Sequence, residues 1–258
     1  MGRGHATQID PATVGVDEAQ ENRAGESGSY CVGVAALPPD YDTDPARVRS
    51  GDRAWQVFGD VHEPVAARIQ AEALVPVLDV GGGHGRLEEL LPAGWPAFVL
   101  DPSPTQLAEA LLLKARADAR RLPISEASVG AVAMLWMLYH LEDPAAAISE
   151  ARRVLRPGGL FAASTSARNN DPELTDGYPP TTFDAEEAAE IVASVFGDVT
   201  VERWDGPMTR LPDHDAVLRY CRSHLLPAEA AERVTPPVWL TKRGCLVYAR
   251  KRSARGAR

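Results

Sequence analysis

The chain has 258 residues, of which 45% are apolar and 24% charged, a composition that is ordinary for a globular protein. This length can bury a sizeable core, and α/β sheets of this size often form one domain. The 27 basic and 36 acidic side chains leave a net charge of −9, which argues against a protein that follows the nucleic-acid backbone but does not exclude a local basic patch. Three cysteines without a CxxC pair argue against a disulfide framework or a zinc ribbon, and favour a reducing, cytoplasmic location.

Two terminal segments bound the expected folded region. Residues 1–28 are polar and glycine-rich without apolar periodicity, which predicts a disordered arm. Residues 251–258 belong to a basic tail that we interpret as solvated rather than as an RNA contact. The longest apolar stretch, Val129–Leu141, has 13 residues and is too short to span a bilayer, and no signal-peptide pattern precedes it at the N-terminus. We therefore expect residues 29–250 to form a single domain that does not enter a membrane.

Apolar runs and helical patterns alternate along this region. The predicted helices cover residues 54–73, 86–91, 105–113, 144–155 and 185–196. The predicted strands, which are short and almost continuously apolar as buried parallel strands are, cover residues 75–80, 97–100, 129–135, 160–164, 199–204 and 245–250. Strands that alternate with helices predict a doubly wound, mostly parallel α/β sheet.

A glycine cluster follows the first expected strand. Asp79-Val-Gly81-Gly82-Gly83-His84-Gly85 has four glycines in five residues. Glycine adopts positive φ and lets the backbone approach a ligand closely, and doubly wound sheets bind ligands beyond the carboxyl ends of their strands. The G-x-G-x-G spacing differs from the G-x-G-x-x-G of nicotinamide enzymes, and no Lys-Ser/Thr pair follows as in a phosphate-binding loop. The pattern predicts a cofactor site and disfavours an NAD-dependent oxidoreductase.

Three carboxylates near strand ends favour a nucleoside that carries a cation and no phosphate. Asp79 would repel a pyrophosphate but suits an ammonium group. Asp101 ends the next strand, 22 residues further on, where it can accept hydrogen bonds from both ribose hydroxyls. Asp118 precedes Ala119 and can accept from an adenine amino group. S-adenosylmethionine fits this description.

At family spacing, three segments resemble the class I S-adenosylmethionine-dependent methyltransferases. VLDVGGGHGRL is similar to the first motif, LDPSPTQL to the acidic end of the second strand, and ADARRLPISEASVGAVAMLWMLYHLEDPAAAISEARRVLRPGGLF to the rest of the core. The resemblance runs from about Val75 to Phe161 and is strongest to the small-molecule branch with the ubiquinone- and sterol-type enzymes. It implies a seven-stranded Rossmann-like sheet whose last strand is reversed, with a core of about residues 75–204 and 241–250.

The resemblance also implies roles for individual positions. Asp101 would hold the ribose, Asp118 and Ala119 would contact the adenine edge, and Leu135 and Trp136 would flank the sulfonium. The full set expected to bind the cofactor is Asp79, Gly81, Gly82, Gly83, Asp101, Pro102, Asp118, Ala119, Leu135 and Trp136. Two positions depart from the family pattern: an Asp is common where Gly130 stands, and a bulky aliphatic residue is common where Pro102 stands.

Methyl transfer from a sulfonium is an in-line displacement, in which positioning alone can supply about 7–11 kcal/mol. A base is needed only when the acceptor must lose a proton. His140, just after the third long strand, is the candidate base, and the adjacent Tyr139 is a weaker candidate. His140 can equally be a structural residue that joins this turn to the next helix. His62, His84 and His224 are expected at the surface, and no local cluster of ligands predicts a metal.

The acceptor is expected between three variable segments, about residues 30–59, 166–183 and 205–240, with the polar loop Asn169–Asp171 as a possible contact. They supply the candidate pocket walls Trp55, Phe58, Trp204, Met208 and Trp239, for which core packing is the alternative. We predict a methyltransferase that acts on an O, N or C atom of a small molecule. An RNA-modifying methyltransferase and a non-catalytic cofactor-binding scaffold are the alternatives. The sequence leaves the acceptor and the oligomeric state open.

Overall fold

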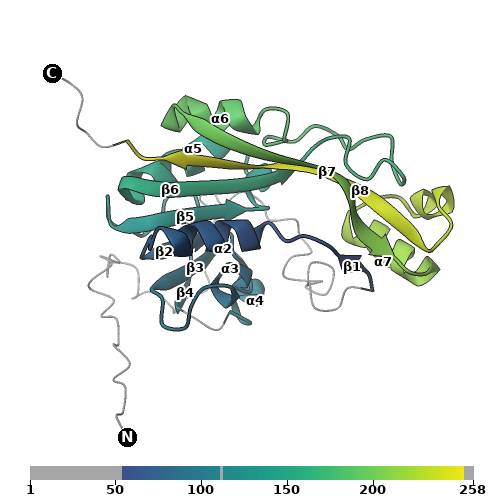
Figure 1. Ribbon diagram of the computed structural model, residues 1–258, viewed down its shortest axis with the longest axis horizontal. Coiled ribbons are helices and arrows are strands. Elements are labelled where there is room, and N and C mark those ends of the chain that lie inside the picture. Colours follow the sequence, from purple (N-terminus) through teal and green to yellow (C-terminus); the bar gives the residue numbers. More distant parts are fainter. Residues whose placement is uncertain (1–53, 111–112, 253–258) are drawn as a thin grey trace, which may run out of the picture.

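The computed structural model describes residues 54–110 and 113–252. Within them an eight-stranded sheet has the order β1-β7-β8-β6-β5-β2-β3-β4 (Figure 1). Five strands are mutually parallel: Val77–Val80 (β2), Ala97–Asp101 (β3), Leu113–Arg116 (β4), Val129–Leu135 (β5) and Leu155–Ser166 (β6). Val238–Arg250 (β8) is antiparallel to β6 and to Val199–Leu211 (β7), and Gln56–Val57 (β1) pairs with β7 at the edge. The expected mostly parallel sheet with a reversed last strand is confirmed, with β1 as an additional short strand.

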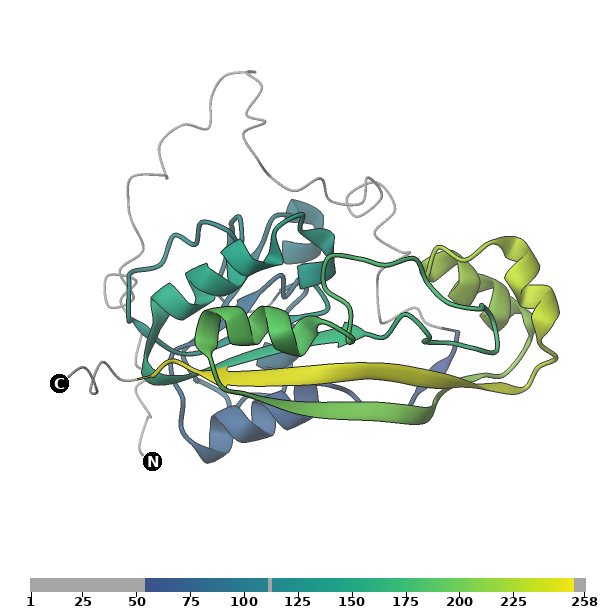
Figure 2. The same cartoon turned by 90° about the horizontal axis from the view of Figure 1, so that it is seen from above.

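Helices cover both faces of the sheet, because both faces of its central strands are apolar. Figure 2 shows α5 (Pro144–Val154) and α6 (Ala188–Phe196) on one side and α2 (His62–Ala71) on the other. Two further short helices, α3 (Arg86–Glu89) and α4 (Pro104–Leu107), pack on the α2 side. No helix in the described part of the chain has the length and apolarity that a membrane crossing requires.

Two predicted elements differ in the structure. The predicted helix 105–113 is reduced to α4, and the chain then forms β4, which was not predicted. The four residues of β4, Leu-Lys-Ala-Arg, are all exposed at the sheet edge, and so short a run with one strongly apolar residue can also end a helix. The predicted helix 54–73 is likewise reduced to α2, and β1 precedes it.

The hairpin of β7 and β8 carries the second part of the fold. The two strands pair continuously from Val199 opposite Ala249 to Leu211 opposite Val238, and their far half extends beyond the parallel strands (Figure 1). Between them lie α7 (His214–Ser223) and the 3₁₀ helix η4 (Ala228–Arg233), which share a separate apolar cluster around Tyr220 and Leu240. We call residues 205–240 the cap. The predicted variable segment 205–240 is therefore partly strand.

At Gly130 the backbone of β5 passes very close to the chain that precedes β2. A Cβ atom at this position would lie 2.7 Å from the Val75 backbone nitrogen and 2.8 Å from the Leu74 carbonyl carbon. Any side chain would require the backbone to shift. This contact explains why Gly130 stands where the family commonly has an Asp.

We expect Gly130→Ala to destabilise the protein by about 1–3 kcal/mol, because overpacking against backbone cannot be relieved by a rotamer change. Gly206→Ala is the matched control, since no atom lies within 4 Å of its Cβ position. Urea unfolding of both variants measures the difference. Equal stability of the two variants would contradict the close backbone approach.

Candidate active site

A cleft of about 1270 Å³ opens at the carboxyl ends of the parallel strands, between the sheet and the cap. Sequence-predicted residues that line it are Asp79, Gly81, Gly82, Gly83, Asp101, Leu135, Trp136, Tyr139 and His140. Parallel pairing explains this convergence, because it aligns the carboxyl ends of neighbouring strands at one edge of the sheet. Residues from the cap and from the segment before α2 close the other side of the cleft.

The glycine loop and Asp101 hold each other. In the register of β2 and β3, Val80 lies opposite Leu100, and the Gly81 N–H donates to the Leu100 carbonyl at 2.6 Å. The two Asp101 carboxylate oxygens accept from the Gly83 N–H at 3.1 Å and from the Ser103 N–H at 2.8 Å. The carboxylate is therefore preorganised at the tip of β3 and only 7% exposed.

Gly82 is required by its contact with Asp79. A Cβ atom on Gly82 would lie 2.2 Å from Asp79 Oδ2. The side chain of Asp79, which is 2% exposed, thus fits directly beneath the loop. A glycine at this point lets the loop close over a carboxylate, and the surface of the loop is left as backbone that a ligand can approach.

Sequence reasoning missed a third carboxyl group in this place. Glu88, on α3, is 7% exposed, and neither of its carboxylate oxygens has a hydrogen-bond donor among the described residues. Burial raises the pKa of Glu88 to about 7. Burial, together with the neighbouring charges of Glu88 and Asp101, raises the pKa of Asp79 well above its usual range. We call the carboxyl groups of Asp79, Glu88 and Asp101 the acid cluster. The raised pKa values indicate that nearby positive charge does not balance them.

The adenine-side predictions are placed differently. Pro102, Asp118 and Ala119 do not line the cleft, and Gln106 and Glu109 line it instead. Both carboxylate oxygens of Asp118 accept hydrogen bonds from the Arg120 guanidinium, and Ala119 is buried in the core beneath. The assigned roles of these three residues toward adenine remain predictions.

The end of β5 supplies the wall opposite the acid cluster. Trp136 has a positive φ of 59°, a strained conformation for an aromatic residue, and its indole meets that of Trp204 edge-on at 5.8 Å. Tyr139 and His140 follow in the 3₁₀ turn Leu138–His140 (η3), with their rings 4.4 Å apart. All four residues line the cleft.

A histidine expected at the surface also lines the cleft. His62 Nδ1 lies 2.6 Å from Asp60 Oδ1, and the Arg86 Nε donates to Asp60 Oδ2 at 2.9 Å. Burial alone would raise the pKa of Asp60, but the hydrogen bonds from His62 and Arg86 outweigh it and hold this pKa well below its usual range. The Asp60 carboxylate therefore fixes the ring, with Nδ1 as the donor and Nε2 as the acceptor in the neutral form. The sequence did not reveal this role of His62, because the contact between Arg86 and Asp60 that holds the carboxylate beside the ring joins segments 26 residues apart.

Comparison with known proteins identifies the core of this fold. Residues 78–163 match a family model described as a methyltransferase domain. This part of the chain is thus similar to the class I S-adenosylmethionine-dependent methyltransferases. This matched region contains the glycine loop, Asp101 and the whole of β5, so it includes most of the cofactor side of the cleft.

Curated relatives align with only part of this chain. An uncharacterized methyltransferase of Mycobacterium tuberculosis is 40% identical over 99 residues, which are 36% of this chain and 40% of the relative. A malonyl-[acyl-carrier protein] O-methyltransferase of Xylella fastidiosa is 34% identical over 99 residues, 34% of each chain. The match thus spans about a third to two fifths of these relatives.

Solved structures share the fold over more of the chain. The [4+2]-cyclase SpnF superposes with a TM-score of 0.55 at 15% identity, and the alignment covers 85% of this chain and 97% of that one. The YcgJ protein of Bacillus subtilis gives a TM-score of 0.51 at 14% identity, covering 69% and 92%. At these identities the likeness concerns the fold alone.

The candidate pocket walls divide into two groups. Trp55, Trp204 and Met208 line the cleft, whereas Phe58 and Trp239 pack on each other at 4.9 Å and remain almost half exposed. Asp184, Glu186 and Glu187 are the carboxylates in the described ranges that lie close enough to share a metal ion. They are outside the cleft, and Arg168 pairs with Asp184 and Glu187.

The acid cluster predicts a pH dependence of stability. With its pKa raised from 4.5 to about 7, Glu88 keeps a proton in the folded protein that the unfolded chain releases above about pH 4.5. Stability from this group is therefore complete below pH 4.5 and is lost as the pH rises to 7, by on the order of 3 kcal/mol. We expect Glu88→Gln to remove this loss between pH 5 and 8 in urea unfolding of the ligand-free protein.

Glu89→Gln is the matched control for this measurement. Glu89 is the next residue along α3, pairs with Arg86 at the surface and has a side chain that is 49% exposed. It should keep the wild-type pH dependence. If Glu88→Gln also kept it, the proton would reside elsewhere.

Proposed function

We propose that this protein transfers the methyl group of S-adenosylmethionine to an O, N or C atom of a small molecule. The acid cluster is the observation that carries the proposal. Buried carboxyl groups that lie close to one another favour a ligand that brings its own cation, because an uncompensated buried charge is costly. S-adenosylmethionine offers both an ammonium and a sulfonium group, and it has no phosphate for the cluster to repel.

The described residues fit the parts of this cofactor. Asp79, which lines the cleft, would compensate the ammonium beside the glycine loop, with Glu88 buried behind it, and Asp101 would accept the ribose hydroxyls. Gln106 and Glu109 are placed to approach the adenine side. When bound, the cofactor supplies an electrophilic methyl group. The role of the chain is to hold the acceptor in line with it and to remove a proton where the acceptor has one.

Four imidazoles line the cleft, those of His62, His84, His140 and His224. Two of them are candidates for the acceptor of that proton. The position of His140 after β5 made it the candidate base, and it lines the cleft as a base must. The geometry favours His62, because the Asp60 carboxylate both orients its ring and would stabilise the imidazolium that forms. We therefore propose His62 Nε2 as the proton acceptor and Asp60 as the residue that positions it.

The likeness to a cyclase defines the competing function. SpnF is described as a [4+2]-cyclase, so the fold by itself does not require methyl transfer. Transfer of isotope from methyl-labelled S-adenosylmethionine into an acceptor distinguishes the two activities. A pool of small metabolites and a pool of cellular RNA, assayed separately, test the substrate class.

We expect calorimetry to detect binding of S-adenosylmethionine and S-adenosylhomocysteine but not of NAD. Asp101→Ala should weaken this binding about tenfold or more, because a charge-assisted acceptor contributes about 1.5–3 kcal/mol per hydrogen bond. Asp143→Ala is a control, since Asp143 caps α5 away from the cleft. Binding of NAD alone would reject the proposal.

For the base we expect His62→Gln to lower the single-turnover rate by about 10²–10⁴-fold with a hydroxyl acceptor, while the affinity for S-adenosylhomocysteine stays nearly unchanged. Asp60→Asn should lower the rate less and alter the acidic limb of the pH–rate profile. If His140→Gln has the large effect and His62→Gln does not, the base is His140. Full activity in both variants would mean that positioning suffices.

A further inference from the structure

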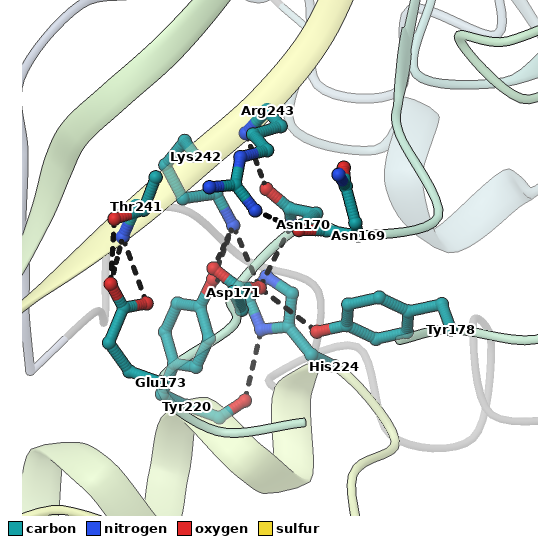
Figure 3. Close-up of polar contacts among 10 residues, drawn as sticks. All are labelled: Asn169, Asn170, Asp171, Glu173, Tyr178, Tyr220, His224, Thr241, Lys242 and Arg243. Carbon is teal, nitrogen blue, oxygen red and sulfur yellow. Dashed lines mark hydrogen bonds and ion pairs between the residues drawn. The ribbon is translucent and has the colours of Figure 1, made fainter. Parts of the chain in front are cut away.

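The cap side of the cleft contains a second charged cluster, far along the sequence from the first. Its centre is Asp171, whose side chain is completely buried. Lys242 Nζ donates to both carboxylate oxygens, at 2.7 and 3.0 Å (Figure 3). The hydroxyls of Tyr178 and Tyr220 and the Asn170 amide also donate to it, at 2.9, 3.0 and 2.9 Å. This number of donors offsets the desolvation of the carboxylate.

The cluster fixes two polar groups that line the cleft. Lys242 Nζ also donates to the Tyr220 hydroxyl at 2.6 Å, so the phenol accepts from the ammonium and donates to Asp171. Both residues line the cleft, and the Lys242 side chain is 19% exposed. The His224 ring stacks on the Tyr220 ring at 3.8 Å, and its Nδ1 lies 2.9 Å from the Tyr220 carbonyl oxygen. These groups are held before any ligand arrives, which reduces the entropic cost of binding.

Charge is distributed unevenly along the cleft. Every carboxylate among the described lining residues comes from the cofactor half of the chain: Asp60, Glu63, Asp79, Glu89, Asp101 and Glu109. The lining residues from 110 onward include no carboxylate, but they include Lys242, the Asn170 amide and several hydroxyls. The part of the cleft around these groups also has aromatic walls. Trp55 lies edge-on to Tyr220 at 5.2 Å, and Trp136 lies against Trp204. This part of the cleft therefore complements a flat ligand with negatively charged oxygen.

The size of the cleft leaves room for such a ligand. Sites for one small molecule are typically about 300–1,000 Å³. The cleft is about 1270 Å³ and extends from the acid cluster to Lys242. A nucleoside cofactor at the acid cluster would therefore leave room for a second molecule around Lys242, Tyr220 and Asn170. We call this part of the cleft the cap half.

We propose that the cap half is the acceptor subsite and that it selects an aromatic acid, whose anionic oxygen accepts a hydrogen bond from Lys242 Nζ. Asp171 and the Tyr220 hydroxyl, whose proton is donated to Asp171, are the positioning groups for this ammonium. The inference rests on the proposed function, because it assumes that the cofactor occupies the acidic half. Since Asp171 already balances the charge of Lys242, selection depends on short directed hydrogen bonds rather than on long-range attraction.

The test measures binding in the presence of saturating S-adenosylhomocysteine. Ligand-observed NMR is applied to a panel of hydroxybenzoic and naphthoic acids, each paired with its neutral primary amide. We expect acids to bind in preference to their amides, and Lys242→Met to weaken acid binding about tenfold or more. Arg243→Met is the matched control, because Arg243 is the next residue of β8, pairs with Asp205 outside the cleft and should leave acid binding unchanged.

Two further measurements make each outcome decisive. Because Lys242→Met leaves the buried Asp171 carboxylate without its cation, the double variant K242M/D171N removes both charges and should fold where the single variant does not. Calorimetry of S-adenosylhomocysteine separates the two proposals: lack of binding to the wild type rejects the proposed function. If that cofactor product binds but amides bind as well as acids, no acid binds, or Lys242→Met has no effect, only the acceptor subsite is overturned, and the cluster serves to brace the cap.

Discussion

Three neighbouring buried carboxyl groups, those of Asp79, Glu88 and Asp101, are the constraint on which the site depends. Asp79 and Asp101 are brought together by the parallel register of β2 and β3, and Glu88 faces them from α3. Like charges in a low-dielectric environment cannot all ionise without a compensating cation. The ligand-free protein retains a proton there, and a cationic ligand would replace it. The buried carboxyl groups, which lower the stability of the ligand-free protein as the pH rises, would thus favour binding of a cationic cofactor.

Gly82 and Gly130 show how closely the backbone is fitted around this cluster. The loop can cover Asp79 only because Gly82 has no Cβ atom, and β5 can approach the chain before β2 only because Gly130 has none. Gly82 is set by its contact with Asp79 at the cleft, and Gly130 by its contact with the backbone before β2. The departure from the family pattern at Gly130 is therefore a packing requirement.

The hairpin of β7 and β8 gives the molecule its second functional half. Its near half completes the sheet, and its far half carries α7 and η4, with their own apolar cluster, over the cleft. Lys242 lies on this far half and Asp171 on the loop after β6, so their ion pair joins the hairpin to the loop that follows the parallel strands.

The cofactor half could be predicted from the sequence because its signals are local. Asp79, the glycine loop and Asp101 lie at the ends of short apolar strands, and parallel pairing brings such ends to one edge whatever the rest of the chain does. The edge strand β4 gave no such signal, since so short a run with one strongly apolar residue can also end a helix. The burial of Glu88 could not be predicted from the sequence either, because a Glu on a short, charged helix is typical of a surface position.

Only the tertiary structure decided the groups that act across large sequence separations. His62 gains its orientation from Asp60 and Arg86, and the latter is on a different helix. Asp171 and Lys242 are 71 residues apart and meet because the long hairpin folds back over the core. A one-dimensional pattern reports periodicity and nearest neighbours, whereas burial, charge compensation and ring orientation depend on which distant segments pack together. Composition and motifs therefore determined the fold and the carboxyl edge of its parallel strands, and packing decided the groups that we propose as base and acceptor side.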